Sequence, residues 1–212
     1  MAERIPIHRG ARPALDHLAA ARVPRVQAGR GIAQPHGRLT QQVAASFLHA
    51  DIGYSFGHQW KPRLSLEFDR ATGDKPGGSF NRFDTLFGMR RADLAPAGLY
   101  NAVARTNVVT PGIRIEVTPT KRLDAFAAYR AMWLEAREDS FSSTAVRDAA
   151  GRSGTFAGHQ HEARIRYWLV PEKLRFEFDG LLFAKGRFLT DAPNAPPGRS
   201  TRYGSFNLTA SF

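Results

Sequence analysis

From residue 41 onward, hydrophobic and polar residues alternate with a period of two, which is the pattern of β-strands with one apolar and one polar face. In residues 63–69, for example, Leu64, Leu66 and Phe68 alternate with four polar or charged residues. The pattern recurs in seven segments and predicts an all-β protein. The predicted strands are residues 46–56, 63–69, 113–118, 123–133, 162–170, 174–187 and 204–212.

The connections between these strands alternate between short and long, and each short one contains Pro and Lys. A soluble meander has no reason to alternate in this way. Outer-membrane barrels do, because their periplasmic turns are short and their extracellular loops long. If residue 212 lies on the periplasmic side, every short connection lies there too, so the pattern predicts an antiparallel up-and-down transmembrane β-barrel. The short connections are residues 58–62, 119–122 and 171–173, and the long ones are about 71–105, 139–158 and 188–200.

The polar faces of the predicted strands carry arginines and carboxylates in close succession, as in Arg114 with Glu116. A charged lumen with apolar residues turned to lipid explains both the alternation and the loop lengths. A small soluble barrel with an apolar interior is a rival, and it would turn Phe176, Phe178 and Leu182 inward.

Residues 1–40 differ from the rest of the chain. They contain seven Arg, two acids and four Pro, with almost no period and no apolar run of the kind that a secretory signal needs. We predict a disordered or mis-started basic leader at 1–40, followed by the barrel segment at 41–212. A basic arm for nucleic acid is the alternative, but the segment has no Phe, Tyr or Trp to stack on bases.

Composition narrows the function classes. The 212 residues include no Cys, which excludes disulfides, thiolate zinc sites and a thiol nucleophile. No apolar run is long enough for a transmembrane helix. The net charge of +11 is compatible with a soluble basic β protein that binds nucleic acid or another polyanion. That protein would need arginines and aromatics on one face, whereas here they lie on opposite faces.

The sequence shows no convincing catalytic or metal motif. His159 and His161 lie close together but lack a third ligand at a suitable spacing. Asp69, Asp74 and Asp84 lack the ordered spacing of a Ca²⁺ loop. There is no phosphate-binding glycine loop and no nucleophile elbow. We therefore predict neither an enzyme nor a cofactor nor a metal site.

Several ungapped blocks resemble the alginate export family, the outer-membrane channels related to the porin through which alginate is secreted. The resemblance covers about residues 41–212. The final strand is also similar to the signal by which barrel-assembly machinery recognises outer-membrane proteins, through Phe206, Leu208, Ala210 and Phe212. The blocks are IGYSF (52–56), PRLSLEFDRATGD (62–74), FDTLFGMRR (83–91), GLYNAVARTN (98–107), FSSTAVRDAAGRSGTFAGHQ (141–160), EARIRYWLVPEKLRFEF (162–178), FAKGRFLTDAPNAP (183–196) and TRYG (201–204).

The resemblance implies a channel in the outer membrane of a Gram-negative bacterium. Its partners would be outer-membrane lipid, the assembly machinery and an anionic polysaccharide, with no role for nucleic acid. Barrels of this family are large, in the class of roughly 16–18 strands that encloses an aqueous lumen. Seven strands are too few for such a barrel, and their number is odd. The predicted segment is therefore the C-terminal part of a larger barrel. Because the sequence shows no signal peptide, export of this chain by itself is not predicted.

The implied cargo is alginate, a polyuronate with one carboxylate on each sugar, or small anions that pass without an energy source. Arginine binds carboxylates through two parallel hydrogen bonds and stays charged, and rings of basic residues select anions in pores. The interleaved acids would prevent binding that is too tight, or the two signs would form structural cross-strand ladders. The lumen candidates are Arg63, Arg114, Arg130, Arg164, Arg166, Arg175, Lys185 and Arg187, with Glu116, Glu162, Glu177 and Asp179.

Overall fold

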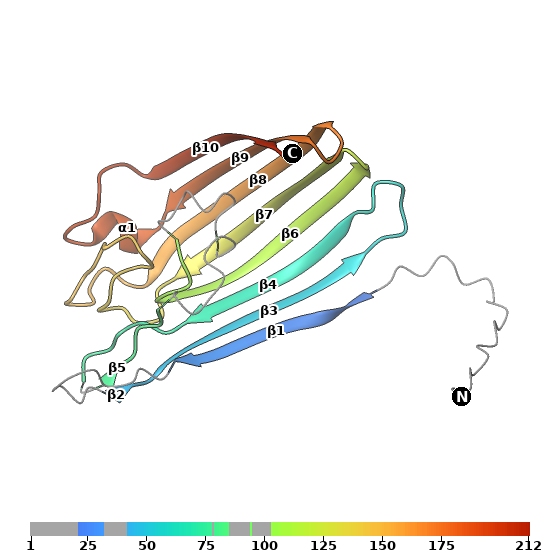
Figure 1. Cartoon of the computed structure of the whole chain (residues 1–212). Helices are drawn as coiled ribbons and strands as arrows, with labels where there is room; N and C mark the ends of the chain where they lie inside the picture. The colour runs from blue at the N-terminus through green and yellow to red at the C-terminus, as the bar shows by residue number, and fades with distance from the viewer. Residues whose placement is uncertain (1–20, 32–41, 78, 85–93, 95–102) are drawn as a thin grey trace, which may run out of the picture.

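Eight long strands form one antiparallel sheet in the computed structural model of the chain (Figure 1). The structure describes residues 21–31, 42–77, 79–84, 94 and 103–212. Neighbours in the sheet follow the order of the chain, β1-β3-β4-β6-β7-β8-β9-β10. The strands are β1 (Ala21–Gly31), β3 (Ala45–Ser55), β4 (Arg63–Ala71), β6 (Val108–Thr120), β7 (Leu123–Trp133), β8 (Phe156–Val170), β9 (Leu174–Lys185) and β10 (Ser200–Ala210).

The seven predicted strands are all present, and β1 is an addition. It lies within the segment predicted to be a leader, and its residues pair antiparallel with β3 from Ala21 opposite Tyr54 to Gly31 opposite Ala45. The prediction of an unstructured leader is therefore wrong for residues 21–31, while residues 1–20 and 32–41 lie outside the described part. The pattern failed here because the register shifts around Pro24, which interrupts the period of two. The described part of the chain therefore contributes eight strands to this sheet.

The alternation of short and long connections is confirmed. We call the end of the sheet with the short connections the turn end, and the opposite end the loop end. Both the start of β1 and the end of β10 lie at the turn end (Figure 1). The loop end also carries a short parallel pair, β2 (Gln42–Val43) with β5 (Ser79–Phe80), and the helix α1 (Arg187–Asp191). The short connections are residues 56–62, 121–122 and 171–173, and the long ones are 72–107, 134–155 and 186–199.

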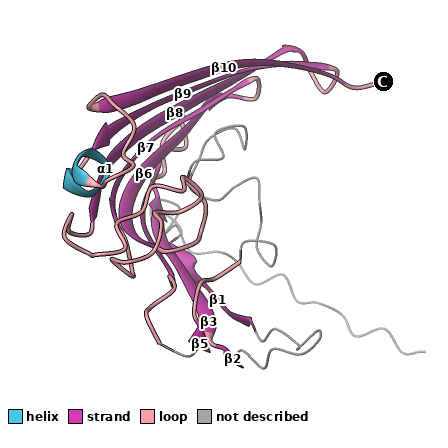
Figure 2. Ribbon diagram, turned by 90° about the vertical axis from the view of Figure 1, so that its left-hand side faces the viewer, coloured by secondary structure: helices cyan, strands magenta, loops and turns pink. Residues whose placement is uncertain are grey.

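The sheet curves into an open arc, and loops of the loop end fold into its concave side (Figure 2). Within the described residues, β1 and β10 each have one neighbouring strand in this sheet. The hydrophobic core lies at the loop end, where Phe141 and Phe188 are fully buried near Met132 and Phe183. No helix in the described part of the chain is long and apolar enough to cross a membrane.

The two faces of the sheet reverse the arrangement of a soluble barrel. Ile52, Leu66 and Phe206 are 56%, 58% and 75% exposed, whereas Asp69 and Asp179 are almost completely buried. The soluble-barrel prediction is therefore wrong. Leu182 is exposed, and Phe176 and Phe178 pack against Phe206 on the same outer face, with ring centroids 6.1 and 4.9 Å away.

Candidate functional site

Ion pairs cross the strands on the concave face near the turn end. Arg63 Nη2 lies 2.6 Å from Asp51 Oδ1, and its Nη1 lies 3.2 Å from Glu116 Oε2. Arg114 Nη2 lies 2.8 Å from the other oxygen of Glu116. Gly53 leaves room for this arrangement, because a Cβ there would lie 2.5 Å from Arg63 Nη2. The two pairs of Arg63 are the cross-strand ion pairs that were the structural alternative for the predicted lumen residues, whereas Arg114 and Glu116 both belong to β6.

Nearer the loop end, a cluster of opposite charges is buried. Arg130 forms ion pairs with Glu67, Asp69 and Glu162, the last two over 3.4 and 3.9 Å. Arg105 Nη2, from the long connection before β6, lies 2.9 Å from Asp69. Arg130 is only 6% exposed and Glu162 7%. Their prediction as residues of an open path is not supported by this geometry, because burial and compensation leave them little capacity to meet a passing anion.

His49 also joins this buried cluster, through a contact of 2.8 Å between its Nδ1 and Asp69 Oδ1. From the sequence, Asp69 was predicted only to lie on the polar face of its strand and was rejected as a calcium ligand. Arg105 and His49 were not among the predicted site residues. No local pattern could have found them, because β3, β4 and a long loop bring these three residues together from distant parts of the chain.

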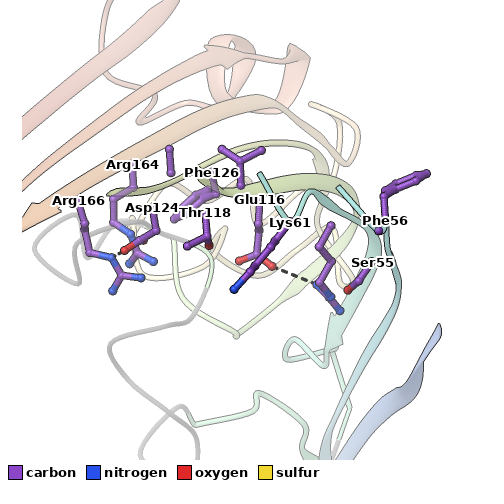
Figure 3. A pocket seen from close by; sticks show the side chains of 13 residues that line it. Ser55, Phe56, Lys61, Glu116, Thr118, Asp124, Phe126, Arg164 and Arg166 are labelled. Atoms are coloured by element: carbon purple, nitrogen blue, oxygen red, sulfur yellow. Dashed lines mark hydrogen bonds and ion pairs between the residues drawn. The ribbon is translucent and has the colours of Figure 1, made fainter. Parts of the chain in front are cut away.

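A cavity of about 700 Å³ opens on the concave face at the turn end (Figure 3). Lys61, Arg63, Arg164 and Arg166 line it, against the acids Glu116 and Asp124. The four cations outnumber the two carboxylates, which gives the cavity a positive balance.

Of the two arginines of β8 in this cavity, Arg166 forms an ion pair, with its Nε 2.7 Å from Asp124 Oδ1. Arg164 forms no ion pair among the described residues. In Figure 3, Arg164, Arg166 and Asp124 lie together on one side of the cavity, with Lys61 on the other. The structure therefore brings together in one space Arg63, Arg164 and Arg166 from the predicted lumen set, together with Glu116.

Phe126 is the aromatic residue beneath this group of charges. The Cζ atom of Arg114 lies 3.7 Å from its ring centroid, and that of Arg164 lies 4.7 Å away. Both guanidiniums therefore make cation–π contacts with the same ring. The sequence analysis did not select Phe126. The available signal was a large aromatic residue between Asp124 and Arg130 on the same face of β7.

Two further predicted residues lie in β9, away from the cavity lining. Arg175 stacks over Trp168, with its Cζ 5.5 Å from the ring centroid, and its Nη2 lies 3.9 Å from Glu177. The Arg175–Glu177 pair lies within β9, on the polar face of that strand.

Asp179 is fully buried and its carboxylate is turned toward β10. Its Oδ2 accepts hydrogen bonds from Ser205 Oγ and Asn207 Nδ2 over 3.2 and 3.4 Å. These hydrogen bonds link β9 to β10.

Lys185 and Arg187 lie at the loop end. Lys185 Nζ donates hydrogen bonds to the carbonyl oxygens of Pro196 and Pro197, over 2.8 and 3.2 Å. The prediction that Arg187 belongs to a strand is wrong, because β9 ends at Lys185 and Arg187 begins α1, where its Nε lies 3.3 Å from Asp191. The structure does not place either cation with the others.

The histidine pair noted in the sequence lies beside Tyr129. The Tyr129 hydroxyl is 2.7 Å from His159 Nδ1, and its ring centroid is 5.1 Å from that of His161. Among the described residues, no three metal-binding side chains of the His, Cys, Asp or Glu type converge. The immediate partner of both histidines is thus an aromatic residue.

Comparison with protein families agrees with this arrangement. The profile of the alginate export family matches residues 26–201, from within β1 to the start of β10. The chain belongs to the alginate export family. This is a family of outer-membrane β-barrel channels rather than enzymes, so the predicted family and fold class are confirmed. No curated protein matches the sequence.

Proposed function

We propose that this member of the alginate export family forms the wall of an outer-membrane conduit in a Gram-negative bacterium. The conduit would pass an anionic polysaccharide of the alginate type, or small anions, without an energy source. The single observation that carries the proposal is the reversed polarity of the sheet. Apolar side chains are exposed on the convex face, and charged side chains line the concave face.

The convex face is suited to lipid. Strands of about 9–11 residues span a bilayer when tilted, and β3, β7 and β10 each contain 11. Tyr54, Phe56 and Trp60 are exposed at the turn end, where aromatic rings of outer-membrane barrels favour the level of the headgroups. These features support a membrane position with the turn end on the periplasmic side.

The cavity supports a preference for anions. Basic side chains that face a water-filled path attract anions and repel cations, and here Lys61, Arg63, Arg164 and Arg166 outnumber two acids. Arginine also matches the planar carboxylate of a uronate sugar through paired hydrogen bonds. A polyuronate is thus the polymer whose charge and geometry fit this surface.

The experiment is conductance in planar lipid bilayers. The chain is refolded in detergent and inserted, and the reversal potential is measured across a KCl gradient. We expect a preference for chloride over potassium, and we expect that the double variant Arg164→Glu with Arg166→Glu loses this preference. A monodisperse protein without detergent that binds nucleic acid would overturn the proposal in favour of a soluble polyanion-binding protein.

We also propose that barrel-assembly machinery recognises the last strand. Phe206, Leu208 and Ala210 are exposed on the convex side, and Phe212 follows β10. We expect Phe212→Ser to reduce the amount of protein in the outer membrane of an expressing cell, whereas Ser211→Ala leaves it unchanged. Equal amounts of both variants would contradict this role.

A further inference from the structure

We infer that Arg164 is the residue that determines carboxylate specificity in the conduit, and that Phe126 is the positioning residue that holds its guanidinium ready. The inference rests on the proposed function and deepens it. Among the strand arginines of the predicted set, Arg164 is the one that forms no ion pair with a carboxylate in the described part of the chain. The ligand class is a planar, singly charged carboxylate such as that of a uronate sugar.

The other strand arginines of the predicted set already have carboxylate partners. The pairs formed by Arg63, Arg114 and Arg130 are described above, and Arg166 and Arg175 pair with Asp124 and Glu177. In the described part of the chain, no carboxylate forms an ion pair with Arg164. A charge that is already paired has less to gain from a passing anion than one that is not.

The register explains why Arg164 has no partner. It lies directly opposite Asp179 of β9, which would be the natural partner for a cross-strand ion pair. The Asp179 carboxylate instead accepts hydrogen bonds from Ser205 and Asn207 of β10. On the other side, the residue of β7 opposite Arg164 is Phe126. Phe126 carries no charge and cannot form an ion pair.

Phe126 fixes the orientation of the guanidinium without using its hydrogen-bonding edge. A cation–π contact engages the flat face of the guanidinium, whereas its N–H donors point outward in the plane. Arg164 Nε is buried without a hydrogen-bond partner, and the residue lines the cavity. Arg114 also stacks on the same ring. The ring therefore contacts one guanidinium that is ion-paired with Glu116 and one that has no ion pair among the described residues.

The test is block of chloride current by a short uronate oligomer, trigalacturonate, in planar bilayers. We expect block of the unaltered protein, and we expect Arg164→Gln to raise the half-blocking concentration about tenfold or more, the scale of losing charged hydrogen bonds. Arg166→Gln is the matched control. It removes the same charge two residues away, and we expect less than about a threefold change because Asp124 already compensates it.

Two conservative variants separate positioning from charge. Arg164→Lys keeps the charge but loses the planar fork, so we expect it to retain chloride preference while uronate block weakens. Phe126→Leu should weaken the block nearly as much as Arg164→Gln, and Phe126→Trp, which restores an aromatic face, should recover it. Equal effects of Phe126→Leu and Phe126→Trp would overturn the role of the ring.

The absence of native cysteine permits a test that does not depend on comparing separately folded variants. In Arg164→Cys, the introduced thiol is the only one in the chain. A thiol reagent that carries a guanidinium group, added to the inserted channel, should restore uronate block. Reagents that carry an ammonium or an anionic group should not restore it, and Arg166→Cys should respond to none of the three. Equal responses at the two positions would overturn the inference alone. If the unaltered protein shows no anion-selective conductance, the proposed function fails as well.

Discussion

The concave side of the sheet differs between the loop end and the turn end. At the loop end, the concave side is filled by folded loops, an apolar core around Phe141 and Phe188, and the buried cluster around Arg130. At the turn end, the concave side holds an open cavity of about 700 Å³. Charges are thus enclosed and compensated at one end and accessible at the other.

This difference shows that composition alone does not identify a binding surface. Arg130 and Arg164 are the same residue type, both on the concave face, yet only Arg130 lies among three carboxylates. Arg130 stabilises the contacts between strands, whereas Arg164 is available to a ligand. Substitutions at the two ends test this contrast.

The largest effect is expected from Arg130→Met. Removing the guanidinium leaves Glu67, Asp69 and Glu162 buried without their shared cation, and breaking a buried ion pair in this way costs about 3–5 kcal/mol. Urea unfolding in detergent, followed by tryptophan fluorescence, measures the loss. The control Arg166→Met removes a cation from a pair whose side chains are about one-third exposed, so we expect about 1 kcal/mol or less. Similar losses for both would mean that the two ends do not differ.

A second large effect is expected from Asn107→Ala at the loop end. The buried Oδ1 of Asn107 accepts hydrogen bonds from the backbone N–H groups of Glu135 and Ala136, over 3.0 and 2.7 Å. Its Nδ2 donates to the carbonyls of Ala136 and Ser140. Its φ of +43° is also better tolerated by Asn than by Ala. We expect a loss of about 2–3 kcal/mol in the same unfolding measurement.

Thr120→Ala is the control for Asn107→Ala at the turn end. Thr120 Oγ1 also accepts two backbone N–H hydrogen bonds, from Arg122 and Leu123, but at an exposed site. Water can replace them there, so we expect a loss of about 0.5–1 kcal/mol. A loss as large as that of Asn107→Ala would refute the idea that burial separates the two ends.

A smaller effect is expected from Glu135→Gln in the long connection after β7. Although burial opposes ionisation, hydrogen bonds from Lys75, the Gly73 N–H and Arg70 keep the pKa of Glu135 below its usual value. Arg70 and Lys75 are each about half exposed, so the pairing contributes about 1 kcal/mol or less. Because the folded pKa is lowered, this contribution is present at neutral pH and is lost on acidification. The difference in urea unfolding between the unaltered protein and the Glu135→Gln variant should therefore vanish at low pH.

The smallest effect is local and concerns Asp148. Hydrogen bonds from the Ser153 hydroxyl and from the N–H groups of Ser153, Ala150 and Arg152 lower the pKa of Asp148 from 3.8 to about 2. The stabilisation is complete above the ordinary pKa and is lost as the pH falls through about 2. We expect hydrogen-exchange protection of these three amides to decrease between about pH 4 and pH 2. Asp148→Asn should abolish that pH dependence while leaving the protection of β8 unchanged.

Periodicity and loop length correctly predicted seven strands and their order of short and long connections, because a strand with one apolar and one polar face must alternate. They missed β1, where Pro24 lies at a shift in register. For the site, the polar face was correctly assigned, and Arg63, Arg164, Arg166 and Glu116 do share one cavity. The rest of the predicted set is divided among ladders, a buried cluster and the loop end.

The amino-acid sequence alone established which residues face which side of the sheet and to which family the chain belongs, because both follow from the linear order of residues. Which cations are compensated emerged only from the folded structure. Partners in a sheet come from other strands, and their choice depends on register and on the direction in which each side chain turns. Asp179 lies opposite Arg164 but turns to Ser205 and Asn207, and within the described residues Arg164 is left without an ion pair.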